Sequence, residues 1–83
     1  MSEFAISFHA QEQMLNRGID ESIVSQALKV PLDIVEEDGL DVYHHILKEG
    51  EREYLLRVYV NSEKIPPLVV TVYKTSKIKK YLP

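Results

Sequence analysis

The strongest constraint on the fold is a single change of hydrophobic period, which falls at Leu32. Before this residue, apolar side chains recur at the spacing of a helix, and after it they follow the alternation of strands. A chain of 83 residues has room for one domain, so residues 1–83 are expected to fold as a unit. Helices followed by strands predict an α+β fold of two layers.

The first part of the chain predicts two short helices. The first spans Phe8 to Arg17, because Ser7 is a suitable N-cap and Gly18 suits the left-handed position after the last turn. The second follows Asp20, another good N-cap, and ends at Pro31. The two helices are expected to pack together on one face of the sheet.

The second part predicts an antiparallel meander of about four strands. Asp38-Gly39 is the dipeptide most typical of a two-residue hairpin turn, and residues 48–51 form the next turn. Residues 2–6 predict either a short edge strand or a lead-in. The four strands are expected over Leu32–Glu37, Leu40–Leu47, Arg52–Val60 and Leu68–Tyr73. The last is apolar on both faces, as a central strand is.

Composition excludes several classes of site. There is no cysteine, hence neither a disulfide nor a thiolate metal site. His44 and His45 are successive strand residues that point to opposite faces, so no metal site is expected. No signal-peptide pattern opens the chain, and no apolar run approaches the ~20 residues of a membrane span. These features predict a cytoplasmic protein without a membrane partner.

Charge is divided unevenly along the chain. Residues 1–53 hold four basic and twelve acidic side chains, whereas residues 54–83 hold six basic and one acidic. A polyanion would have to bind to residues 54–83. The asymmetry therefore favours a localised anion-binding site over non-specific binding along nucleic acid.

The first predicted helix presents an unusual polar side. His9, Gln13 and Arg17 fall together on it at helical spacing. An imidazole, a carboxamide and a guanidinium can hold an anion and move a proton near neutral pH. The alternative is a solvated surface without further function.

Arg57 lies in the middle of a strand otherwise made of tyrosine, leucine and valine. A guanidinium cannot be buried there without an anionic partner or access to solvent. One interpretation is a phosphate clamp, which suits the planar fork of arginine. The other is a structural ion pair with Glu36, Glu37 or Asp41.

Hydroxyl and lysine side chains gather in the last part of the chain. Thr71 and Tyr73 share one face of a strand, and Thr75 continues it. These groups can bind a phosphate or, for tyrosine, stack on a base. They are equally ordinary strand residues. Lys80 belongs to a basic tail that is either an RNA-facing patch or a solvated end.

Several of these segments together resemble a known family of small bacterial proteins. They are Ser7-Phe8-His9-Ala10, Met14-x-x-Arg17-Gly18-Ile19, Val24-x-x-Ala27-Leu28, the strand around Arg57, and Val70-Thr71-Val72-Tyr73-x-Thr75. The family is a domain of unknown function whose members look like distant relatives of RelE-type toxins, within the barnase/colicin/RelE ribonuclease-like fold. Gln13 departs from it, since relatives commonly carry arginine there.

The resemblance implies a toxin of a toxin–antitoxin pair that cleaves RNA without metal or cofactor. The partners it implies are RNA, including ribosome-associated mRNA, and an antitoxin protein. Under this hypothesis His9 is the general acid or base, Arg17 and Arg57 stabilise charge on the phosphate, and Tyr73 positions the substrate. The remaining substrate-binding residues are Gln13, Thr71, Thr75 and Lys80. The alternative is a non-catalytic protein- or RNA-binding module with the same fold.

Overall fold

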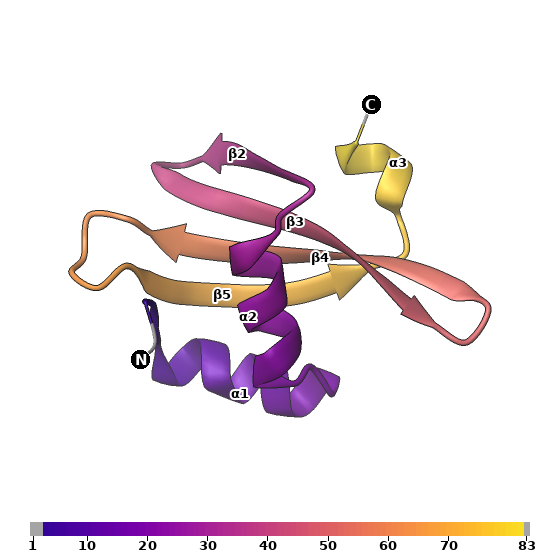
Figure 1. The fold of residues 1–83 in the computed structure, drawn as a ribbon, viewed down its shortest axis with the longest axis horizontal. Helices are drawn as coiled ribbons and strands as arrows, with labels where there is room; N and C mark the ends of the chain where they lie inside the picture. The colour runs from indigo at the N-terminus through magenta and orange to yellow at the C-terminus, as the bar shows by residue number, and fades with distance from the viewer. Residues whose placement is uncertain (1–2, 83) are drawn as a thin grey trace.

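The computed structural model describes residues 3–82, which form three helices and a five-stranded sheet. In chain order the elements are β1 (Ala5–Ile6), α1 (Phe8–Arg17), α2 (Glu21–Lys29), β2 (Asp33–Glu37), β3 (Leu40–Glu49), β4 (Arg52–Asn61), β5 (Leu68–Thr75) and α3 (Ile78–Tyr81). The strand order is β1-β5-β4-β3-β2. Figure 1 shows α1 beside β5, α2 across the sheet and α3 beyond the end of β5. The predicted α+β class is therefore confirmed.

The prediction of four antiparallel strands is wrong in part, because the sheet is mixed and has a fifth strand. Strands β2 to β5 form the expected antiparallel meander. Strand β1 pairs with β5 in parallel, with Ala5 opposite Leu68 and Ile6 opposite Val69. Because β1 leads directly into α1 beside β5, its backbone reaches that edge, and the Ser7 N–H donates to the Val69 carbonyl at 2.9 Å. Helix α3 was also not expected in the basic tail.

Two tight turns set the register of the meander. Asp38-Gly39 has positive φ at both residues, 52° and 79°, which matches the predicted two-residue turn. The next turn is also tight and carries Gly50 with φ 62°. As a result Asp33 lies opposite His44, and His44 lies opposite Arg57 on the next strand.

The caps of α1 form as predicted. The Ser7 hydroxyl oxygen accepts a hydrogen bond from the Ala10 N–H at 3.1 Å, and Gly18 adopts φ 64° while its N–H bonds the Leu15 carbonyl. Asp20 occupies the N-cap position of α2, although its side chain makes no capping hydrogen bond within residues 3–82. No helix in residues 3–82 has the length and apolar character needed to cross a membrane.

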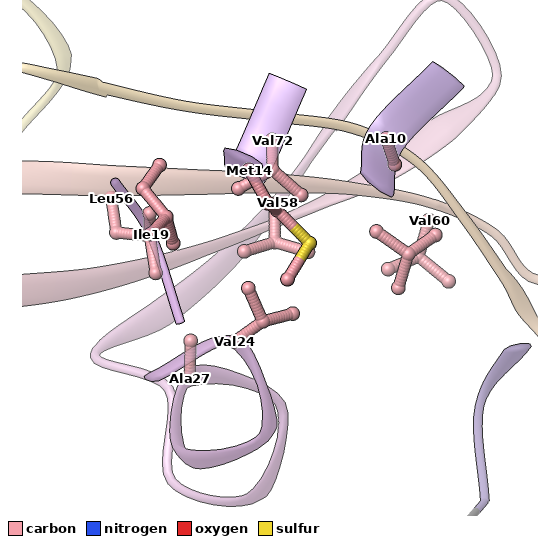
Figure 2. Packing of buried hydrophobic residues seen from close by; sticks show 10 residues of the cluster. Ala10, Met14, Ile19, Val24, Ala27, Leu56, Val58, Val60 and Val72 are labelled. Atoms are coloured by element: carbon pink, nitrogen blue, oxygen red, sulfur yellow. The ribbon is translucent and has the colours of Figure 1, made fainter. Parts of the chain in front are cut away.

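The hydrophobic core lies between the sheet and the first two helices, and we call this side of the sheet the helix-covered face. Figure 2 shows Met14 of α1 among valines of α2, β4 and β5. The cluster is formed by Ala10, Met14, Ile19, Val24, Ala27, Leu56, Val58, Val60, Val69 and Val72. The middle strand β4 is buried on both faces, since Leu55 and Arg57 on the opposite side are also buried. That opposite side, the second face, carries the candidate site.

Candidate functional site

The second face holds a connected group of polar side chains centred on one buried arginine. We call it the Arg57 cluster, and it consists of Asp33, Glu37, His44, Arg57, Tyr59, Tyr73 and Tyr81. Four strands and α3 contribute to it. The cluster joins residues that are up to 48 positions apart in sequence, Asp33 and Tyr81, through side-chain contacts alone.

Arg57 is only 2 % exposed, and its donors are directed to four neighbours. Its Nη1 donates to the hydroxyls of Tyr59 and Tyr73 at 2.9 and 2.7 Å. Its Nη2 forms an ion pair with the Glu37 carboxylate, which also accepts a hydrogen bond from Tyr59 at 3.2 Å. A buried guanidinium needs such partners. The structure therefore contains the ion pair with Glu37 that the sequence offered as the structural interpretation of Arg57.

His44 connects Arg57 to a second carboxylate. Its Nε2 accepts a hydrogen bond from Arg57 Nε at 3.0 Å, and its Nδ1 lies 2.7 Å from Asp33 Oδ1. An imidazole nitrogen that accepts from arginine carries no proton, so the proton must be on Nδ1 and is donated to Asp33. This pattern defines a neutral imidazole with a fixed tautomer.

The tyrosines extend the cluster toward the surface. Tyr73 accepts from Arg57 and donates to the Tyr81 hydroxyl at 3.3 Å. The Tyr81 ring covers Arg57, whose Cζ is 4.0 Å from the ring centroid, and Lys80 Nζ lies 5.4 Å from the same ring. A cation over an aromatic face is favourable, especially when it is desolvated. Tyr81 thus presents a hydroxyl next to Lys80 at the outer end of a chain of hydrogen bonds.

Ionisation follows from these contacts. The hydrogen bond from Arg57 lowers the pKa of Glu37, and burial opposes this effect less strongly. Burial raises the pKa of Tyr59. The hydrogen bond from Tyr73 lowers the pKa of Tyr81, and the nearby charges of Lys80 and Arg57 act in the same direction. Burial opposes the charge of Arg57, but hydrogen bonds to Tyr73 and Glu37 outweigh it and raise its pKa.

The lowered pKa of Glu37 makes a testable prediction about acid stability. As pH falls, the unfolded chain takes up this proton before the folded protein does, so Glu37 stabilises the fold fully above about pH 5 and progressively less below it. We expect Glu37→Gln to flatten the fall in free energy of unfolding between about pH 5 and pH 3. Urea unfolding at several pH values measures this slope.

Glu36→Gln is the matched control for that experiment. Glu36 is the exposed neighbour of Glu37 in β2, and no ion pair joins it to residues 3–82. Its variant should keep the slope of the parent protein. Equal slopes for Glu37→Gln and the parent would contradict the assignment.

The predicted polar side of α1 serves the backbone of β5. Gln13 Oε1 accepts from the Val72 N–H at 2.9 Å, and Arg17 Nη1 donates to the Val72 carbonyl at 2.7 Å. These bonds cover the β5 edge where β1 has ended. His9 is exposed and makes no hydrogen bond or ion pair with the described residues. The structure therefore brings Arg57 and Tyr73 together, and no contact joins His9 or Arg17 to them.

The other predicted substrate-binding residues lie around β5 and α3. Thr71 lies opposite Tyr59 and is half-buried on the second face. Thr75 Oγ1 accepts from the Lys77 N–H at 3.1 Å, just before α3 begins. Lys80 is exposed beside Tyr81.

The positions of the histidine and acidic side chains bear on metal binding in the described part of the chain. Within residues 3–82, no three histidine or acidic side chains are placed to hold a metal ion. His44 lies on the second face and His45, opposite Leu56, on the helix-covered face.

Sequence reasoning missed five members of the Arg57 cluster as site residues: Asp33, Glu37, His44, Tyr59 and Tyr81. Of these, Glu37 was expected only as one possible partner in a structural ion pair. Tyr59 shares a strand face with Arg57 two positions away, which was a usable signal. Asp33 and His44 required the register of two hairpins. Tyr81 required the path of the tail after β5, for which the sequence carries no signal.

Fold and site together define a small α+β domain with helices on one face of its sheet and a hydrogen-bonded arginine cluster on the other. The model of a family described as a domain of unknown function (DUF4258) matches residues 6–74, so the chain belongs to that family. The match includes Arg57 and Tyr73 and ends before Lys80 and Tyr81. Comparisons with curated proteins and with solved structures gave no match. The resemblance to an uncharacterised domain family is thus confirmed, and the relation to RelE-type toxins stays a prediction.

Proposed function

We propose that this protein is a RelE-like, metal-independent endoribonuclease that acts as the toxin of a toxin–antitoxin pair. The observation that carries the proposal is the chain of hydrogen bonds from Arg57 through Tyr73 to Tyr81, which ends beside Lys80. It places a cation, tyrosine hydroxyls and a lysine at one end of the second face. Such a surface suits RNA, because the cationic groups can bind a phosphate and the tyrosine rings can stack on a base.

The proposed reaction needs only proton transfers and stabilisation of charge. The ribose 2′-oxygen bonds to the adjacent phosphorus while the bond from phosphorus to the 5′-oxygen breaks. A base takes the 2′-hydroxyl proton and an acid supplies one to the 5′-oxygen, which yields a 2′,3′-cyclic phosphate and a 5′-hydroxyl. Positioned acids, bases and cationic donors supply the catalysis.

The residues divide between the two requirements. Tyr81 accepts its hydrogen bond from Tyr73, so its own proton is free to be donated to a phosphate or leaving oxygen. Lys80 is the cation for the phosphate, and Arg57 acts through the tyrosines because it is buried. His9, the general acid or base expected from the sequence, lies on α1 near the start of β5 and contacts no member of the Arg57 cluster, so it is assigned no proton transfer at the phosphate beside Tyr81 and Lys80.

Cleavage of end-labelled RNA in excess EDTA, free and on ribosomes, tests the proposal. The parent should cleave, and Tyr81→Phe should reduce the rate by roughly a hundredfold, because it loses a positioned proton donor. His9→Ala should keep the rate of the parent, because His9 lies on α1 and contacts no member of the Arg57 cluster. Tyr54→Phe is the matched control, since Tyr54 lies opposite Leu47 and contacts Lys74 and Arg52 rather than the Arg57 cluster.

A non-catalytic RNA-binding module is the second candidate, favoured by the burial of Arg57 and by the hydrogen bonds of Gln13 and Arg17 to the β5 backbone. It predicts RNA affinity that falls steeply with salt and no cleavage. Cleavage by Tyr81→Phe at the rate of the parent would reject the assigned residues. An absence of both binding and cleavage would reject both functions.

A further inference from the structure

The free edge of the sheet is β2. Within residues 3–82 it is the last strand in the order and its one paired neighbour is β3, so one row of its backbone N–H and carbonyl groups faces away from the sheet. Figure 1 shows β2 at the side of the sheet opposite α1. An edge strand of this kind is a template for an added strand from another chain.

Apolar side chains are exposed both in the segment that precedes β2 and in β2 itself. Val30, Leu32 and Ile34 are 62 %, 58 % and 49 % exposed. These three residues occupy every second position. The Leu32 N–H donates to the His44 carbonyl, so the backbone pairing with β3 begins at Leu32. Leu32 and Ile34 therefore fall on the same side of the extended strand. Natural edge strands are usually protected by charges or proline at such positions, and here they are apolar.

The same edge is strongly acidic. Residues 33–41 contain five acidic side chains and no basic one. Asp33 and Glu37 lie on the second face and contact His44 and Arg57, yet their side chains are still 41 % and 39 % exposed. Glu36 and Asp38 are exposed as well. A second copy of this chain would place the same acidic strand against this one, and like charges on adjacent strands are destabilising. The edge also repels RNA, whose proposed site lies at Tyr81 and Lys80.

We propose that β2 accepts an extended segment of a partner protein in which apolar and basic residues alternate. The backbone of the segment extends the sheet beyond β2. Its apolar side chains cover Leu32 and Ile34 on one face of the sheet. Its lysine or arginine side chains fall on the other face, beside the half-exposed carboxylates of Asp33 and Glu37. Backbone hydrogen bonds provide the pairing, and the alternation of apolar and basic positions provides selectivity. This inference is independent of the proposed nuclease.

A short blocked peptide of alternating lysine and valine is the probe, and amide chemical shifts of the full-length protein are the readout. The peptide should shift the amide signals of β2 and bind more weakly as salt is raised. Ile34→Lys should weaken binding by at least about tenfold, because it removes apolar contact area and adds a like charge. Ile65→Lys is the matched control, since Ile65 is 99 % exposed in the connection between β4 and β5. It should bind like the parent.

Two further peptides separate strand addition from simple attraction of charge. The same peptide N-methylated at every internal residue keeps its charge but cannot donate backbone hydrogen bonds, and it should not shift β2. A peptide of alternating glutamate and valine should not bind. The proposal is overturned if the lysine peptide leaves β2 unshifted, if the N-methylated peptide binds equally, or if Ile34→Lys binds like the parent. Concentration-dependent dimerisation that Ile34→Lys abolishes would assign the edge to a second copy instead.

Discussion

Replacement of Arg57 by methionine is expected to lower the free energy of unfolding by about 3–5 kcal/mol, the usual range when one partner of a buried ion pair is removed. Methionine fills a similar volume, so the loss comes from polar groups left without a partner rather than from a cavity. Glu37 loses its counter-ion, and His44 and the tyrosine hydroxyls lose a donor. Urea unfolding followed by circular dichroism measures the change.

Two comparisons make this result specific to the Arg57 cluster. Arg52→Met replaces an exposed arginine at the start of the same strand, and it should change stability by less than about 0.5 kcal/mol. Adding Glu37→Gln to Arg57→Met should recover part of the loss, because the unpaired carboxylate is then gone. A loss below about 1 kcal/mol for Arg57→Met would show that the cluster contributes little to the stability of the fold.

The chain of contacts from Asp33 through His44 to Arg57 was predictable in principle from two turns. A two-residue turn at Asp38-Gly39 pairs residues that are equally distant from it, which places Asp33 opposite His44. A second two-residue turn after Glu49 places His44 opposite Arg57 in the same way. The turn predicted from the sequence spans four residues, 48–51, and a turn of that length does not place His44 opposite Arg57, so the alignment of three polar side chains across three strands was not predicted.

The partners of Arg57 from later in the chain were not predictable in this way. The connection from Asn61 to Leu68 is long and loose, and a bulge shifts the register between Tyr59 and Val60. Local sequence therefore does not determine that Tyr73 lies opposite Arg57. Tyr81 reaches the cluster because of the direction in which the chain turns after β5. Tertiary packing sets this direction, and no local sequence pattern predicts it.

The roles of Gln13 and Arg17 depended on a feature of β5 that sequence does not reveal. Both residues lie in α1 as expected, and Arg17 is exposed there, so its anion-binding role stays a prediction. In the structure β1 is only two residues long, and the β5 backbone at Val72 would otherwise lack partners on that side. Polar side chains that complete a sheet edge and polar side chains that hold a phosphate follow the same sequence pattern.

Replacement of Leu56 by alanine is the other change with a large expected effect. Leu56 is fully buried in the middle strand, on the helix-covered face, in the cluster that contains Ile19 and Ala27 (Figure 2). Removing its side chain loses the transfer free energy of the apolar atoms and leaves a cavity, for an expected loss of about 2–5 kcal/mol. Small domains are stable by only about 5–15 kcal/mol, so this is a large share of the total.

Leu15→Ala is the matched control, because Leu15 lies on the outer side of α1 and is 83 % exposed. It should change the free energy of unfolding by less than about 0.5 kcal/mol. A large loss for Leu56→Ala with a small one for Leu15→Ala places the stabilising contacts between the helices and the sheet. Similar losses for both variants would contradict the observed orientation of α1, since Leu15 would then have to contribute to a buried contact.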